Sequence, residues 1–228
     1  MKKNKKNTQE PQYDRCLSHR ENYGIQTLGL MSGQTWIDDP KRLVFVLSRY
    51  KFAAKMLSGY KNVLEIGCAD AFASKIVAKE VTNLKMIDFD PLFIEDARTQ
   101  DPNGDYLVHD IIKSPVCPNT FQGAYSMDVL EHISKENEDI FLSNISKSLT
   151  ADGTLIIGTP TLYSQAYASP ISKEGHVNCK THEELKSFLQ KYFHQVFIFS
   201  MNDEVIHTGF SKMAHYFMAI CCNPFRDN

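Results

Sequence analysis

The chain has 228 residues, of which 43% are apolar, as is typical of one globular domain or two small ones. This composition excludes a disordered chain, a collagen-like fibre and a disulfide-stabilised miniprotein. The 25 basic and 27 acidic residues give a net charge of −2, which disfavours the concentrated basic face that nucleic-acid binding needs.

The first 60 residues divide into two parts. Residues 1–12 are rich in lysine and poor in apolar side chains, so we expect a flexible tail there. Residues 13–60 are expected to form an N-terminal helical segment. Within it, Asp39 is a suitable cap for a helix that begins with Pro40, and an apolar helical stripe continues until about Gly59.

Residues 61–228 are predicted to form a single domain in which strands and helices alternate. A capping box of Thr181 and Glu184 predicts the start of a late helix. Strands separated by helices indicate parallel βαβ units, whereas the last two strands indicate an antiparallel hairpin. The predicted strands are 61–67, 84–89, 105–108, 121–126, 154–158, 195–200 and 214–221, and the predicted helices are 71–80, 91–98, 135–149 and 181–192.

The cysteines and the hydropathy pattern indicate the cellular compartment in which the protein is expected. The six cysteines form no CxxC pair, and no secretory signal precedes them. No apolar run approaches the ~18 residues that a membrane span needs. We therefore expect a protein of the reducing cytoplasm with no membrane partner.

Acidic residues follow successive predicted strands. A glycine turn, Gly67, comes after the first strand, Asp88 ends the second about 20 residues later, and Asp110 follows the third. In a parallel sheet, ligands bind beyond the carboxyl ends of the strands. A carboxylate at the second strand suits a ribose diol, and one at the third suits an exocyclic amine, because a carboxylate accepts hydrogen bonds. Each acid alone could instead cap the following helix.

The ordered motifs VLEIGCADA, MIDFDP, HDI, SMDVLEHI and ADGTLIIGTP resemble those of the class I S-adenosylmethionine-dependent methyltransferases. The resemblance covers the chain from about Arg49 to its end. It implies an α/β, Rossmann-like sheet of seven strands with helices on both faces, in the order 3-2-1-4-5-7-6 with strand 7 antiparallel. It also implies S-adenosyl-L-methionine as the cofactor and S-adenosyl-L-homocysteine as its product.

The resemblance assigns cofactor-binding roles to particular residues. Asp88 matches the ribose-binding acid, Asp110 the acid that faces the adenine amine, and Arg49 an arginine that meets the methionine carboxylate. The other implied cofactor residues are Glu65, Gly67, Cys68, Ala69, Phe89, Ile111 and Met127.

The glycine motif departs from the family pattern. Ala69 and Ala71 replace the second and third glycines, so a somewhat different turn is expected, because alanine disfavours a positive φ. Phe72 stands where a dinucleotide fingerprint needs its third glycine, which makes NAD an unsuitable cofactor.

Two histidines are candidates for the catalytic base. His132 belongs to a Glu-His pair after the fourth strand, and His176 lies in the long loop after the fifth strand, where acceptors usually bind in this family. A hydroxyl acceptor benefits from such a base, whereas an amine must only be unprotonated. Either histidine could instead be structural.

The acceptor is expected to be a small molecule. Its predicted contacts are Trp36 in the N-terminal segment, which covers the cofactor as a lid in many relatives, together with Tyr163, Tyr167 and Asn178 in the loop after the fifth strand. No metal is predicted, because Asp128 has no evident companion ligands.

The chain thus resembles an O-methyltransferase acting on a small polar metabolite such as a sugar or sugar conjugate. An N-methyltransferase acting on an amino sugar or small amine, and a non-catalytic partner protein that binds S-adenosylmethionine, are the alternatives. The oligomeric state is open, a homodimer included.

Overall fold

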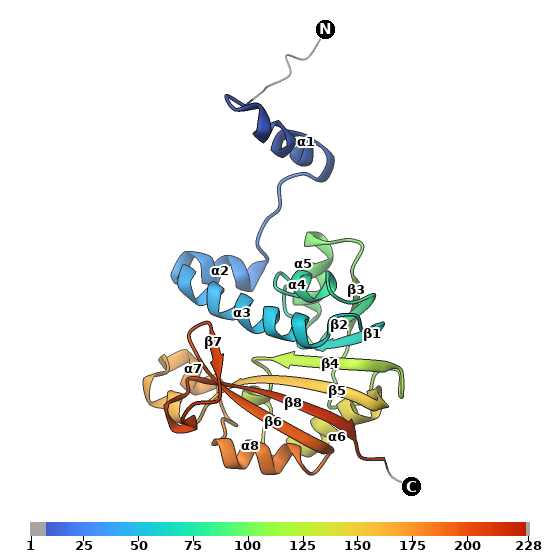
Figure 1. Cartoon of the computed structure of the whole chain (residues 1–228), viewed down its shortest axis with the longest axis vertical. Helices are drawn as coiled ribbons and strands as arrows, with labels where there is room; N and C mark the ends of the chain where they lie inside the picture. Colours follow the sequence, from blue (N-terminus) through green and yellow to red (C-terminus); the bar gives the residue numbers. More distant parts are fainter. Residues whose placement is uncertain (1–7, 227–228) are drawn as a thin grey trace.

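The computed structural model describes residues 8–226, so residues 1–7 of the predicted tail lie outside the described residues. One eight-stranded sheet runs through the molecule in the order β3-β2-β1-β4-β5-β8-β6-β7 (Figure 1). β1 to β5 pair in parallel, whereas β8 runs antiparallel to both β5 and β6. The strands are β1 (Asn62–Ile66), β2 (Asn83–Asp88), β3 (Asp105–Val108), β4 (Phe121–Met127), β5 (Leu149–Pro160), β6 (Phe193–Asn202), β7 (Val205–His207) and β8 (Tyr216–Pro224).

Helices cover both faces of the sheet (Figure 1). The helices are α1 (Asp14–Tyr23), α2 (Leu30–Asp38), α3 (Pro40–Met56), α4 (Ser74–Ala78), α5 (Pro91–Gln100), α6 (Glu138–Ser148), α7 (Pro170–Gly175) and α8 (His182–Leu189). Short 3-10 turns are η1 (Pro11–Tyr13), η2 (Leu130–His132), η3 (Tyr163–Tyr167) and η4 (Ser211–Met213). Within residues 8–226, no helix has the length and apolar character that crossing a bilayer requires. The predicted α/β class and strand order are confirmed.

Two apolar clusters sandwich the sheet. Successive residues of a strand point to opposite faces, so Val63 packs with α3, α4 and α5, whereas its neighbour Leu64 packs with α6 and α8. Both residues are fully buried. Burial on both faces explains why the central strands are continuously apolar rather than alternating.

Local capping chemistry sets two of the helix starts as the sequence predicts. The Asp39 side chain accepts a hydrogen bond from the Lys41 amide (3.3 Å), and Pro40 opens α3. At α8, the Thr181 hydroxyl accepts from the Glu184 amide and the Glu184 carboxylate accepts from the Thr181 amide. This is the predicted capping box.

Besides shifts at the ends of elements and the short helix α7 within the predicted loop after β5, the structure differs from the predicted elements in two places. The polar segment between the closing strands contains an eighth strand, β7, three residues long and paired with β6. The helix after β1 begins at Ser74 instead of residue 71, because Ala71 has a left-handed backbone (φ 54°) that an α-helix cannot contain. The second difference shapes the site, since it lengthens the loop at the end of β1.

The N-terminal segment divides into an outlying helix and two packed ones. α1 stands away from the sheet (Figure 1), and none of its residues is buried. α2 packs on α3, and α3 packs on α4. The helical character predicted for residues 13–60 therefore resides in three helices.

Candidate active site

The loop after β1 is a left-handed turn. Gly67, Ala69 and Ala71 all have positive φ values of 76°, 46° and 54°. The backbone amides of Gly67 and Cys68 both donate to the Ile87 carbonyl of β2, at 2.8 and 3.0 Å. The left-handed conformation is thus kept despite the two alanines, each of which bears a strain of roughly 1–2 kcal/mol.

Asp88 is a buried carboxylate at the end of β2. Its two oxygens accept hydrogen bonds from the backbone amides of Ala69 (2.9 Å) and Asp90 (3.0 Å). These bonds fix the carboxylate against the β1 loop. A carboxylate has about four acceptor positions, so positions remain for the two hydroxyls of a ribose.

Asp110 follows the neighbouring strand, β3. Its carboxylate accepts from the Ile112 amide (3.1 Å) and lies 3.6 Å from the Lys113 ammonium. Ile111 is buried in the core, whereas Phe89 after β2 is 72% exposed. The ends of β2 and β3 therefore present an exposed ring and a carboxylate on adjacent strands, as adenine binding would require.

Glu65 lies in β1 beneath this loop, fully buried. Its carboxyl accepts hydrogen bonds from the hydroxyls of Tyr50 (2.9 Å) and Tyr125 (2.7 Å). Burial raises the pKa of Glu65 to about 7, and the two phenol hydrogen bonds oppose that shift. Its carboxyl supports the loop from below.

Arg49 reaches the site from α3. Its Nη1 atom donates to both oxygens of Asp128, at 2.7 and 2.9 Å, and the guanidinium lies 3.7 Å from the centre of the Tyr216 ring. Asp128 follows β4 with a positive φ of 56°. The Arg49 Nε atom is buried and has no hydrogen-bond acceptor. A cation with a spare buried donor suits a carboxylate ligand.

Glu131, His132 and His176 meet beyond β4 and β5. A carboxylate oxygen of Glu131 and one nitrogen of each histidine lie within 4.8 Å of one another, and the two rings have their centres 5.2 Å apart. Glu131 is 1% exposed and accepts from the Thr159 hydroxyl (3.1 Å). Burial lowers the pKa of His176, and His132 lowers it further, which favours the neutral imidazole. The structure thus brings the two predicted bases close together and places Glu131 beside them.

Glu131 is the residue that sequence reasoning missed. It stands directly before His132 in the Glu-His pair, which is the signal that could have singled it out. The sequence predicts no metal because Asp128 lacks companion ligands. The potential ligands that the fold assembles do not include Asp128.

The loop after β5 is attached to this cluster. The Glu131 carbonyl accepts from the amides of Val177 (2.8 Å) and Asn178 (3.0 Å). The Asn178 side chain is buried, donates to Glu138 (2.7 Å) and accepts from Lys180 (3.0 Å). Both ends of this amide are therefore engaged inside the protein.

The other predicted acceptor residues differ in how far they are buried. Tyr163 packs against the core, whereas Tyr167 is 91% exposed and Trp36 in α2 is half exposed. Met127, predicted to border the cofactor, and Cys68 in the β1 loop are both buried.

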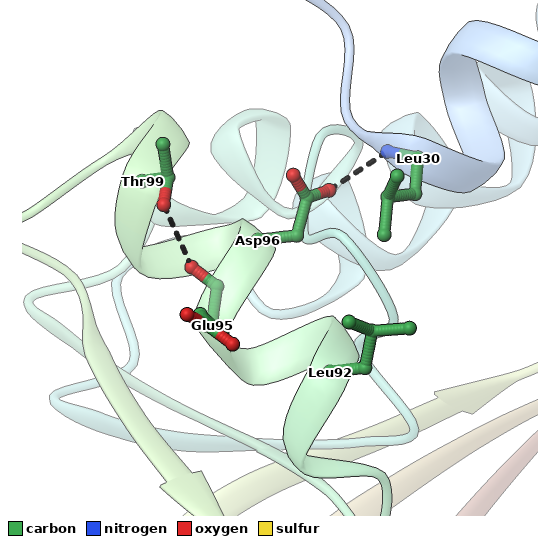
Figure 2. A pocket seen from close by; sticks show the side chains of 5 residues that line it. All are labelled: Leu30, Leu92, Glu95, Asp96 and Thr99. Carbon is green, nitrogen blue, oxygen red and sulfur yellow. Dashed lines mark hydrogen bonds between the residues drawn. The ribbon is translucent and has the colours of Figure 1, made fainter.

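The start of α2 is tied to the cofactor side of the sheet. The Ser32 amide and hydroxyl both donate to Asp70 of the β1 loop, at 2.6 and 3.0 Å. The Leu30 amide donates to Asp96 of α5 (2.7 Å; Figure 2). A hollow of about 310 Å³ lies at this junction. Figure 2 shows the side chains that line it. The hollow is lined by Leu30, Leu92, Glu95, Asp96 and Thr99, and by none of the predicted cofactor residues.

Residues 64–157 match the family model of a methyltransferase domain. This stretch of the chain is a methyltransferase domain, and solved methyltransferases share the fold that contains it. The match of this methyltransferase domain begins in β1 and ends in β5, so it contains the β1 loop, Asp88, Asp110 and Glu131. The N-terminal helices and the loop that carries His176 lie outside it.

A curated relative and two solved structures are similar to this chain. The ubiquinone biosynthesis O-methyltransferase of Schizosaccharomyces pombe is 29% identical over 105 residues, which cover 43% of this chain and only 38% of the relative. A TehB-like methyltransferase from Corynebacterium glutamicum has a TM-score of 0.65 at 16% identity and covers 91% of this chain and 99% of its own. The N-methyltransferase NodS from Bradyrhizobium japonicum, in complex with S-adenosyl-L-homocysteine, has a TM-score of 0.61 at 21% identity and covers 82% and 93%. These two likenesses show the fold alone.

The residues around the ends of β1, β2 and β4 fit S-adenosylmethionine as the cofactor. Asp88 has acceptor positions for the ribose, and Arg49 has a buried donor for the methionine carboxylate. The β1 loop carries no pyrophosphate-binding glycine set, and S-adenosylmethionine has no pyrophosphate.

Proposed function

We propose that the chain methylates an oxygen atom of a small polar acceptor, such as a sugar or sugar conjugate, with S-adenosylmethionine as the methyl donor. The observation that carries this proposal is the placement of the Glu131, His132 and His176 cluster one strand away from the Asp88 loop, at the same edge of the sheet. A cofactor held at one place would then face an acceptor held at the other.

The cofactor half of the site is proposed to work by orientation. Asp88 would accept from the ribose hydroxyls, Asp110 would accept from the adenine amine, and Arg49 would pair with the methionine carboxylate. Phe89 would lie against the adenine. When bound, S-adenosylmethionine supplies an electrophilic methyl group on a sulfonium that leaves as a neutral thioether.

The acceptor half is proposed to position a hydroxyl and to take up its proton. His132 Nδ1 lies 2.9 Å from the Gly175 carbonyl oxygen, and His176 Nδ1 lies 2.9 Å from the Gln165 Oε1 atom. Because these oxygens only accept, each Nδ1 carries the hydrogen, which leaves the Nε2 lone pair of each neutral ring able to take a proton. As the oxygen–methyl bond forms, the hydroxyl proton moves to that lone pair, and the electrons of the breaking carbon–sulfur bond stay on sulfur.

The acceptor and the compartment are part of the same proposal. The curated relative in Schizosaccharomyces pombe is named an O-methyltransferase, which supports an oxygen acceptor. All six cysteines are free thiols, which supports a reducing, cytoplasmic setting. The net charge of −2 supports a small-molecule acceptor rather than nucleic acid.

The first test is calorimetry with S-adenosylhomocysteine, with NADH as the control. We expect S-adenosylhomocysteine to bind and NADH not to bind. We also expect Asp88→Asn to weaken the binding of S-adenosylhomocysteine by about 1–3 kcal/mol, because a charged acceptor is lost, while Asp105→Asn at an exposed site on β3 leaves it unchanged. Equal binding by both variants contradicts the ribose assignment.

The second test identifies the methylated atom. Radiolabelled S-adenosylmethionine is supplied with a panel of sugars, nucleotide sugars and catechols on one side, and amino sugars and small amines on the other. Labelled ethers support the proposal, labelled amines support N-methylation, and binding without any transfer to the panel favours a non-catalytic partner.

A further inference from the structure

Two histidines and a buried carboxylate that lie far apart in the sequence converge beyond the carboxyl ends of β4 and β5. We propose that Glu131, His132 and His176 bind one divalent transition-metal ion. Its suggested task beside the acceptor rests on the proposed function, whereas the binding of the ion does not.

The spacing of the three groups suits a common ion. One atom of each residue lies within 4.8 Å of the others. Ligand atoms 2.0–2.2 Å from a tetrahedral ion lie about 3.3–3.6 Å apart, so the three side chains would rotate toward one another when an ion binds. His132 is exposed and His176 is partly buried, so an ion can enter from the solvent side.

Both imidazoles are held as metal-ligating histidines usually are. A ligating histidine commonly donates its other ring N–H to a carbonyl or carboxylate, which fixes the tautomer and the ring orientation. Here Nδ1 of His132 donates to the Gly175 carbonyl, and Nδ1 of His176 donates to the Gln165 side chain. This arrangement selects the tautomer in which the Nε2 atom of each imidazole is the one that can bind an ion.

In its deprotonated form, Glu131 would supply a negative charge to the ion. Its side chain is 1% exposed and accepts one hydrogen bond, from Thr159. Between residues 8 and 226 no lysine or arginine forms an ion pair with it, because Arg49 pairs with Asp128 and Lys180 with Glu138. A buried carboxylate is stable when it is paired or coordinates a metal, so a bound ion would give Glu131 a cationic partner in direct contact.

The ligand set selects the class of ion. Two imidazoles and one carboxylate suit Mn²⁺, Fe²⁺, Co²⁺, Ni²⁺ or Zn²⁺, whereas Mg²⁺ and Ca²⁺ prefer all-oxygen sites. Three protein ligands leave open coordination positions, as in catalytic rather than structural sites. An ion there would occupy the same Nε2 lone pairs, so it would replace the histidine base of the proposed function. It would activate the acceptor by lowering the pKa of a hydroxyl bound at an open position.

The test uses Co²⁺ as the probe, because its visible absorption reports coordination without any activity assay. The full-length protein is stripped with EDTA and titrated with Co²⁺. We expect one equivalent to bind, and His132→Asn and His176→Asn to weaken binding at least tenfold. The control His194→Asn removes an exposed histidine on β6 and should bind as the unmodified protein does. Equal binding by all three variants, or no stoichiometric binding by the unmodified protein, overturns the site.

Two controls keep the outcome interpretable. His132 is exposed, so its replacement tests the site even where a variant of buried Glu131 fails to fold. S-adenosylhomocysteine calorimetry on the same samples separates the two proposals. Co²⁺ binding without cofactor binding leaves the metal site standing and contradicts the proposed function. Cofactor binding without stoichiometric Co²⁺ binding contradicts the metal site and leaves the proposed function standing.

Discussion

The two halves of the site are built by different kinds of contact. At the cofactor edge, formed by the ends of β1, β2 and β3, Asp88 and Asp110 each accept from a backbone amide two residues onward. Asp88 also accepts from the Ala69 amide in the loop after the preceding strand, β1. At the acceptor edge, formed by the ends of β4 and β5, Glu131 and His132 contact residues about 40 positions later in the chain.

This difference explains which half a short motif can reveal. The geometry at Asp88 follows from a strand, a turn and a helix start, and each of these has a local signature. The geometry at His132 depends on where the loop after β5 returns to the sheet. The following experiments separate the two edges.

The largest expected effect is at the acceptor edge. We expect His176→Ala to lower turnover about 10²–10⁴-fold, because its neutral imidazole is lost from the acceptor site. Affinity for S-adenosylhomocysteine should stay within about twofold if the edges are independent. The measurement combines calorimetry with the rate of methylation of the best acceptor in the panel. His194→Ala is the control, and an unchanged rate for His176→Ala returns this residue to a structural role.

Gly67 joins the two edges by close packing. A Cβ atom there would lie 2.3 Å from Val129 Cγ2 after β4, and φ is 76°. We expect Gly67→Ala to destabilise the fold by about 2–5 kcal/mol in urea denaturation, from backbone strain and overpacking. Gly59→Ala has the same strain (φ 83°) but open space, so about 1–2 kcal/mol is expected. Equal losses would mean that the Val129 contact is unimportant.

Glu65 gives the cofactor edge a dependence on pH. Its folded-state pKa is about 7 against an ordinary value of 4.5, because burial disfavours the charged form. The protonated form therefore stabilises the fold fully below pH 4.5, and this contribution of up to about 3 kcal/mol is lost as pH rises through 7.

We expect Glu65→Gln to remove that loss, since glutamine does not titrate. Denaturant unfolding between pH 4.5 and 8 measures how the free energy of unfolding changes with pH. The control variant Glu21→Gln on exposed α1 should keep the pH dependence of the unmodified protein. A slope that persists in Glu65→Gln would assign the dependence to another group.

The smallest expected effect concerns the anchor of α2. Asp70→Asn weakens the hydrogen bonds from Ser32 by about 1 kcal/mol, because the amide oxygen can still accept from one donor. Hydrogen exchange of α2 should quicken, and S-adenosylhomocysteine affinity should fall less than tenfold. Asp96→Asn releases the Leu30 amide away from the β1 loop, so it should quicken exchange without changing affinity. The same affinity loss in both variants would contradict a specific link through Asp70.

Several features of the fold could be read from the sequence because they arise from neighbours in the chain. The cap at Asp39 and the capping box at Thr181 are examples. The left-handed turn at Ala69 and Ala71 could not, because alanine by itself disfavours it and only the bonds to β2 hold it. The strand β7 is too short to have a pattern of its own.

The sequence by itself determined the succession of strands and helices along the chain and the acids that follow the strands, since periodicity and turn chemistry are local properties. The order of the strands within the sheet was implied by the family resemblance. Only the tertiary structure decided that Arg49 meets Asp128, 79 positions later, and that His176 returns to Glu131 and His132. Such contacts depend on which face of the sheet each helix covers and on the path of each loop, and no short segment encodes either.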